Sequence, residues 1–132
     1  GHVIDMMATV LDLAGTTYPT TYNDSTIFPQ QGRSLVPVFQ GLERNNQEPF
    51  FWEHKGNRAV RKGDWKLVSL NAFSWELYNL ADDRAETLNL VAEHPEKVTE
   101  LATLWQAWAD EIGVLPRDTI IKRKQEQDAC CD

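Results

Sequence analysis

Residues 50–80, where short apolar runs alternate with turn residues, constrain the fold of this chain more than any other stretch. They read FFWEHKGNRAVRKGDWKLVSLNAFSWELYNL and hold three of the chain's five tryptophans. Turn formers interrupt the stretch at 56–57, 62–64 and 71–74, and glycine and asparagine tolerate the positive φ that tight hairpins need. The runs between these breaks are rich in aromatic and β-branched residues, which predicts an antiparallel meander. The predicted strands are 50–55, 57–62, 65–70 and 75–80.

Side chains along these runs alternate as a pleated strand requires. In the third run Trp65, Leu67 and Ser69 share one side, and the residues between them point to the other. In the second run Arg58 and Val60 share one side in the same way. The alternation is mixed rather than strictly apolar and polar. We therefore expect one face of the sheet to be well covered and the other only partly.

A long amphipathic helix is predicted after the meander. His94-Pro95-Glu96 opens it, because proline at the first helical position loses no hydrogen bond and glutamate suits the positive end of the helix dipole. Gly113 and then Pro116 end it. The apolar residues that recur at three- and four-residue steps are Val98, Leu101, Trp105, Trp108 and Ile112. A sheet with one face covered by this helix predicts an α+β fold.

A second helix is predicted at residues 2–14, and Gly15 ends it. This helix is apolar over most of its circumference, which predicts burial on several sides. A small sheet cannot supply that much surface, so we expect the helix to belong to a larger core. The chain begins with Gly1 rather than Met, and we expect it to be a piece of a longer protein.

The remaining segments complete a prediction of four parts. Residues 1–15 hold the helix that needs a larger core, and residues 16–48 are expected to be an irregular linker loop. Residues 49–116 form the sheet and its covering helix. Residues 117–132 are polar without periodicity, which predicts a disordered tail.

Composition excludes some classes of function. A net charge of −7 argues against binding to a nucleic-acid backbone, and the basic run 122–124 is expected to be solvated. No segment approaches the roughly 20 apolar residues of a membrane span. The only cysteines, Cys130 and Cys131, are adjacent, and a disulfide between neighbours is strained. We expect them to be tail residues liable to oxidation.

Together these motifs resemble the sulfatase family, over about residues 1–116. The helix at 1–15 and the loop Gly32-Arg33-Ser34-Leu35 are similar to the end of a sulfatase catalytic domain, and FWEHKGNRAVRKGDWKLV at 51–68 is very close to the arylsulfatase C-terminal subdomain. The residues that continue the resemblance are WELYNL at 75–80, Asp83, Glu86, Asn89, Leu90, His94-Pro95-Glu96, Trp105 and Trp108.

The resemblance implies a parent enzyme with an alkaline-phosphatase-like fold. Its catalytic domain would hold a formylglycine, made from the Cys or Ser of a Cys/Ser-x-Pro-x-Arg motif, and a calcium ion that polarises the sulfate. This chain has no such motif, so catalytic residues, metal ligands and cofactors are carried onto none of its positions. Sulfatases are often exported, which implies a periplasmic or secreted parent.

His54 is the candidate residue for the substrate cleft. In the family the C-terminal sheet leans over that cleft, so a histidine at a strand end could contact the sugar or aryl part of the ester. The alternative is a hairpin residue whose imidazole bonds a neighbour. Arg58, Arg61 and Lys66 could form an anion patch, but we expect them to pair with acidic residues across strands. The expected partners are Glu53, Asp64 and Glu76.

The sequence gives less support to other kinds of catalytic or binding site. Two pairs of acids lack the alternating spacing of a calcium loop, and we expect structural roles for them. They are Asp5, Asp12, Asp82 and Asp83. No nucleophile-elbow motif surrounds Ser34, so a Ser34, His54 and Asp64 triad is not favoured. The tryptophans are expected in the core rather than in a carbohydrate-stacking platform.

The function predicted from sequence is therefore that of a non-catalytic C-terminal fragment of a sulfuric ester hydrolase. It would pack on its own catalytic domain, help to line the cleft for a sulfate ester, and be inactive alone. The alternative is an independent binding or interaction module without a hydrolase role. In the isolated chain, helix 2–14 is expected to find other apolar surface, its own or that of a second copy.

Overall fold

The computed structural model describes residues 1–44, 49–71 and 73–129, apart from the side chains of 124 and 127–129. The chain divides into two compact units, Gly1–Asn45 and Asn46–Asp132. Within the described residues no helix has the length and apolar character needed to cross a lipid bilayer.

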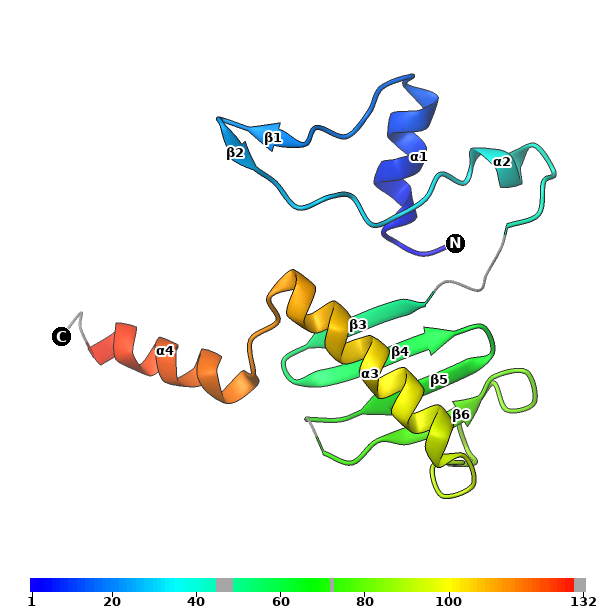
Figure 1. Cartoon of the computed structure of the whole chain (residues 1–132), viewed down its shortest axis with the longest axis vertical. Coiled ribbons are helices and arrows are strands. Elements are labelled where there is room, and N and C mark those ends of the chain that lie inside the picture. Colours follow the sequence, from blue (N-terminus) through cyan, green and yellow to red (C-terminus); the bar gives the residue numbers. More distant parts are fainter. Residues whose placement is uncertain (45–48, 72, 130–132) are drawn as a thin grey trace. The chain divides into compact units, whose positions relative to one another are not determined.

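The second unit contains the predicted meander. Its strands β3 (Phe50–His54), β4 (Asn57–Lys62), β5 (Trp65–Ser69) and β6 (Glu76–Asn79) form an antiparallel sheet in the order β3-β4-β5-β6. The long helix α3 (Pro95–Ile112) crosses one face of this sheet (Figure 1). The prediction of an α+β fold with a four-stranded meander, a long covering helix and an N-terminal helix is confirmed.

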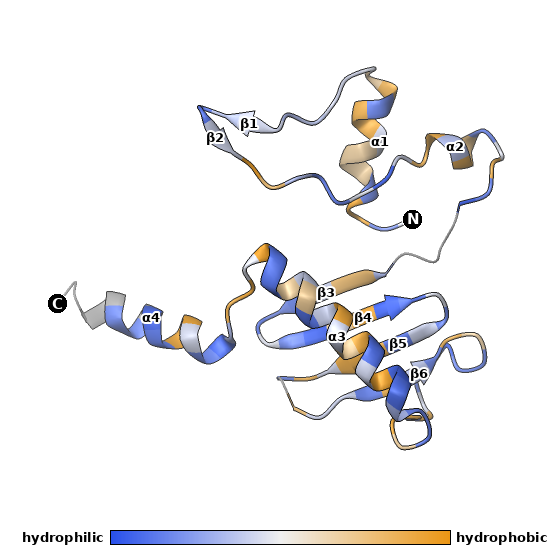
Figure 2. Cartoon of the chain, viewed as in Figure 1, coloured by the Kyte–Doolittle hydropathy of each residue, from blue (hydrophilic) through white to orange (hydrophobic). Residues whose placement is uncertain are grey.

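The core of this unit is one row of side chains across the sheet, pressed against α3. Val60, Leu67 and Leu77 are direct neighbours in the strand register, and each has an exposed fraction of 0%. Leu101 and Trp105 of α3 pack on this row. Hydrophobic and hydrophilic residues alternate along α3, as a helix with one covered face requires (Figure 2).

Both ends of α3 follow the sequence signals. Pro95 occupies the first turn, and Gly113 after the last residue adopts the left-handed conformation, with φ of 73°, that favours glycine. Its N–H reaches back to the carbonyls of the last turn.

The expectation of a disordered tail at 117–132 is wrong for residues 117–129. Helix α4 (Arg117–Ala129) begins directly after Pro116. Arginine, lysine, glutamine and glutamate are good helix formers, so the segment forms a helix without an apolar face. The Arg117 guanidinium also donates a hydrogen bond of 2.6 Å to Asn71 Oδ1, which anchors the start of α4 beside the sheet. Cys130 and Cys131 lie outside the described residues.

The first unit contains helix α1 (Asp5–Leu13), the hairpin β1 (Thr21–Tyr22) and β2 (Ser25–Thr26), and the short helix α2 (Val36–Phe39). The segment predicted as an irregular loop therefore has regular elements of its own. The turn between β1 and β2 holds Asn23 and Asp24 at φ of 47° and 61°. Positive φ at both central residues matches the twist of a hairpin, which explains why this Asn-Asp pair closes one.

A buried ion pair holds the first unit together. The Asp5 carboxylate, with an exposed fraction of 0%, accepts hydrogen bonds of 2.6 and 3.0 Å from the Arg44 guanidinium. It also accepts the backbone N–H groups of His2 and Arg33, and these hydrogen bonds, that of Arg44 above all, hold the pKa of Asp5 well below its usual range. A Cβ atom at Gly32 would lie 1.9 Å from the Ile4 carbonyl oxygen, so only glycine permits this close approach.

Replacement of a core leucine should lower the stability of the second unit. Leu67→Ala is expected to reduce its free energy of unfolding by about 2–5 kcal/mol, because the close-packed row cannot collapse fully around the lost side chain. Chemical denaturation followed by tryptophan fluorescence measures this. Leu70→Ala is the matched control, since Leu70 is 65% exposed. Similar losses for both variants would show that the row is not the core.

The Asp5 ion pair predicts an acid-sensitive first unit. Because the folded-state pKa of Asp5 is depressed, the stability it contributes is fully present above its ordinary value of about 3.9 and is lost as the pH falls below it. Asp5→Asn should remove this pH dependence and cost about 3 kcal/mol, since it leaves Arg44 without its charge partner. Protection of the Arg33 N–H from hydrogen exchange reports the change. Asp12→Asn, on the exposed side of α1, should leave it intact.

Candidate functional site

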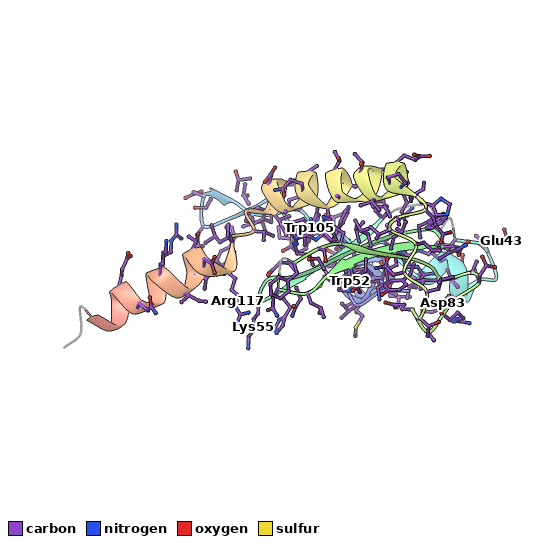
Figure 3. All side chains as sticks on the ribbon, turned by 90° about the horizontal axis from the view of Figure 1, so that it is seen from below. Glu43, Trp52, Lys55, Asp83, Trp105 and Arg117 are labelled. Carbon is purple, nitrogen blue, oxygen red and sulfur yellow. The ribbon has the colours of Figure 1, made fainter. Side chains whose placement is uncertain are left out.

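The face of the sheet opposite α3, here called the open face, carries the side chains that alternate with the core row. Arg61 lies directly opposite Lys66 in the register of β4 and β5. Trp52 lies opposite Ala59 in the register of β3 and β4. Figure 3 shows Trp105 reaching from α3 toward the sheet and labels Trp52 on β3. The same alternation that buries the core row therefore collects cations and an indole on the open face.

A hollow of about 750 Å³, here called the sheet cleft, lies between this face and residues 80–86. Its volume is within the range of small-molecule sites, roughly 300–1,000 Å³. The residues that line it are Trp52, Ala59, Arg61, Asp64, Lys66, Leu80, Ala81, Arg84 and Glu86. The sheet cleft is our candidate site.

Three cations line the sheet cleft, each in a different setting. Lys66 Nζ lies 2.5 Å from Glu86 Oε1, which forms a half-buried ion pair. Arg61 donates from Nε to the Gly63 carbonyl over 2.9 Å. Arg84 is exposed, and it makes no ion pair or hydrogen bond with any residue that the structure describes. The sheet cleft therefore presents cationic hydrogen-bond donors together with two acceptor carboxylates, those of Asp64 and Glu86.

The loop that forms one wall of the sheet cleft is held by hydrogen bonds. The Asp83 carboxylate accepts the N–H groups of Leu88 and Thr87 over 2.8 and 2.6 Å, and these backbone hydrogen bonds lower the pKa of Asp83. The Leu80 N–H donates to the Asp64 carbonyl over 2.7 Å. Glu86 has φ of 57°, a conformation that non-glycine residues adopt rarely and that surrounding contacts must maintain.

Tyr78 is buried on the open face, opposite Lys66 in the register of β5 and β6. Burial, with a hydrogen bond from its hydroxyl to Glu76 Oε2 of 2.9 Å, raises the pKa of Tyr78 to about 12. The hydroxyl is therefore a fixed donor at neutral pH and belongs to the structure of the sheet.

His54, the residue singled out from sequence, ends β3 next to the β3–β4 hairpin and is exposed. Its imidazole has no hydrogen-bond or ion-pair partner within the described residues. It does not line the sheet cleft. The alternative prediction, that a neighbour in the hairpin bonds the His54 imidazole, therefore has no support among the described residues. The role of His54 toward substrate stays a prediction.

The structure separates the three cations that were considered as one anion patch. Arg58 lies on the α3 side, with its guanidinium carbon 4.3 Å from the centre of the Trp75 ring and 5.3 Å from that of Trp105. Burial there lowers the pKa of Arg58. Arg61 and Lys66 are on the open face. The predicted pairing partners are also wrong for Lys66, because its partner is Glu86 and not an acid from a neighbouring strand.

The structure brings together no metal-binding group from the acids considered earlier. The oxygens of Asp5 and Asp83 are taken up by Arg44 and by backbone N–H groups. No cluster of at least three His, Cys, Asp or Glu side chains suited to a metal occurs within the part of the chain that the structure describes. Ser34 accepts the Val36 N–H at the start of α2 and lies in a different unit from His54 and Asp64.

The sequence analysis assigned no role in a site to Arg84 or Glu86. Nothing local identifies them, because their place in the sheet cleft depends on how the loop after β6 folds back. Of the tryptophans, Trp65, Trp75, Trp105 and Trp108 pack in or against the core as expected. Trp52, at 37% exposure, lines the sheet cleft instead.

Comparisons with known proteins give a consistent result. No protein-family model matches the chain. An uncharacterized sulfatase of Schizosaccharomyces pombe is 30% identical to it over 120 residues, which cover 86% of this chain and 22% of that protein. A sulfatase of Formosa agariphila is 27% identical over 114 residues, which cover 74% of this chain and 20% of that protein.

Solved structures agree. The crystal structure of Ps i-CgsB shares the fold with a TM-score of 0.63 at 23% identity, over 80% of this chain and 23% of its own. A protein solved with its substrate D-glucosamine-2-N,6-O-disulfate is 25% identical, with a TM-score of 0.60, over 86% of this chain and 25% of its own. The resemblance noted in the sequence is thus confirmed: the chain is a relative of the sulfatases, and it spans about a fifth of the length of the curated sulfatases it matches.

Proposed function

We propose that this chain is the C-terminal subdomain of a sulfuric ester hydrolase whose catalytic residues lie in an upstream domain. One observation carries the proposal: the sulfatase relatives match 86% and 74% of this chain but only 22% and 20% of their own length. The unmatched part of each relative is therefore about 3.5 to 4 times as long as the matched part (78/22 and 80/20), and we assign the chemistry to it.

The exposed apolar surface of α1 supports packing on a catalytic domain. Met6, Val10 and Leu13 are 66%, 61% and 68% exposed, although a soluble helix normally buries such a face. Only Asp5, Ala8 and Thr9 of α1 are buried within the first unit. The upstream domain of the same protein would cover the remaining apolar side chains.

The cofactors of the reaction belong to that upstream domain in this proposal. Formylglycine would supply the nucleophile and Ca²⁺ would polarise the sulfate oxygens. The carboxylates of Asp5 and Asp83 do not fit a calcium site, because they already accept hydrogen bonds from the protein. We therefore assign no cofactor ligand to the described residues. Export of the parent to a periplasm or the cell exterior is proposed on family grounds alone.

The role of this chain toward the substrate would be positioning. His54 stands at the end of β3 with its imidazole exposed, so it can donate or accept a hydrogen bond from a substrate hydroxyl. A residue in this place would affect substrate binding more than the chemical step, because it does not touch the reacting sulfur.

The parent protein provides the test. Its upstream region should contain Cys/Ser-x-Pro-x-Arg, mass spectrometry should find formylglycine there, and the parent should hydrolyse an aryl sulfate. Residues 1–132 alone should not. A parent without the motif and without sulfatase activity would favour an independent binding module, and hydrolysis by residues 1–132 alone would contradict the non-catalytic assignment.

His54→Ala in the parent should raise KM roughly three- to tenfold with little change in kcat, as expected for loss of one hydrogen bond to bound substrate. Steady-state kinetics on several sulfate esters measures this. Lys55→Ala is the matched control, because Lys55 is its exposed neighbour in the β3–β4 turn. An unchanged KM on every ester that the parent accepts would remove His54 from the substrate cleft.

A further inference from the structure

Arg58 is a half-buried cation without a carboxylate partner among the described residues. Its guanidinium lies against the Trp75 and Trp105 rings, 4.3 and 5.3 Å from their centres, and burial lowers the pKa of Arg58. Nη2 donates a hydrogen bond to Ser69 Oγ over 3.3 Å, while the buried Nε donates to no described residue. A guanidinium that is withdrawn from water normally pairs with an anion, because an isolated buried charge is costly. The absence of an anion here therefore needs an explanation.

The acids that were expected to balance Arg58 from neighbouring strands are bonded elsewhere. Glu53 lies opposite Arg58 in the register of β3 and β4, but its Oε1 accepts the Gly56 N–H over 2.8 Å. Glu76 Oε2 accepts the Tyr78 hydroxyl over 2.9 Å. The ion pairs found among the described residues do not include Arg58. The sheet itself therefore leaves this cation unbalanced.

A second hollow, of about 360 Å³ and here called the hairpin pocket, opens on Arg58. It lies between the β3–β4 turn, the end of α3 and the start of α4, and Trp105 lines it together with Arg58. The hydrogen bond from Arg117 to Asn71 holds its wall on the α4 side. Asp118 also lines the pocket, but it is exposed and forms no ion pair with Arg58. The hairpin pocket therefore gives a group from outside the chain a route to the Arg58 guanidinium.

The hairpin pocket has the composition of a protein interface. Arginine and tryptophan are enriched among the residues that dominate binding energy at interfaces, and they do so where surrounding contacts exclude water. Arg58 and Trp105 lie in the pocket, and the aliphatic side chains of Leu115 and Ile121 line it with 40% and 42% of their surfaces exposed. A partner that covers these aliphatic side chains would shield Arg58 from water and would have to supply its counter-charge.

We propose that the hairpin pocket receives an acidic side chain of the upstream domain, whose carboxylate pairs with the Arg58 guanidinium. The choice of partner rests on the proposed function. This chain covers only 22% and 20% of the two curated sulfatases, so a large part of the parent remains to supply the acid. A guanidinium suits a carboxylate because its N–H donors form a planar fork, and Arg58 keeps a donor unused. The upstream domain would then contact both units, through α1 in the first and through the hairpin pocket in the second.

Formate is the probe for this site in residues 1–132, where the upstream domain is absent. Sodium formate should raise the thermal unfolding midpoint above that in sodium chloride of equal concentration, because it pairs with a cation that otherwise has no anion. The Trp105 indole N–H should shift saturably in NMR spectra with formate and not with neutral formamide. Arg58→Met should abolish both effects. Arg61→Met is the matched control, because Arg61 lies on the same strand but on the open face, and it should retain them. Equal formate effects in the wild type and in Arg58→Met would overturn the proposal.

The intact parent identifies the source of the carboxylate. There the pocket is already filled, so formate should no longer raise the midpoint, and Arg58→Met should lower the midpoint by more than it does in residues 1–132. A solved structure of the parent should place an upstream Asp or Glu oxygen within about 4 Å of the Arg58 guanidinium. No carboxylate there, or a formate effect that persists undiminished, would overturn the proposal. A parent that pairs Arg58 in this way but has no sulfatase activity would refute the proposed function and leave this contact standing.

Discussion

The contact between the row Val60–Leu67–Leu77 and helix α3 determines which side of the sheet each strand residue of the second unit faces. These three side chains come from neighbouring strands and are fully buried, and α3 covers them with Leu101 and Trp105. Because side chains alternate along a strand, burial of this row assigns every intervening residue to the open face. A shift of register by one residue would bury Arg61 and Lys66 and expose the row, so the core itself specifies which strand residues line the sheet cleft.

The sequence predicted those parts of the fold that local signals determine. Turn residues at 62–64 and alternation in 65–70 identify a strand without reference to distant residues, and Pro95 and Gly113 mark the ends of α3. The prediction of a disordered tail at 117–132 rests on the absence of hydrophobic periodicity there. Helix propensity alone can nevertheless produce a helix such as α4. The hairpin at 21–26 was missed because its strands are only two residues long.

The candidate site was less predictable, because it depends on contacts between distant parts of the chain. Strand alternation already places Arg58 and Arg61 on opposite faces, and that could be inferred from their spacing of three. The meeting of Lys66 with Glu86 depends on the fold of the loop after β6, twenty residues later, and no pattern encodes it. His54 was identified through family resemblance, and the structure adds that its imidazole is exposed at a strand end.

Trp52 links the core to the sheet cleft. Its side chain lines the cleft, while its backbone carbonyl accepts a hydrogen bond of 3.1 Å from the Trp105 indole, which lies in the core. This bond ties the β3 backbone at Trp52 to the packing of α3. A ligand surface supported in this way can remain rigid on a sheet of only four strands.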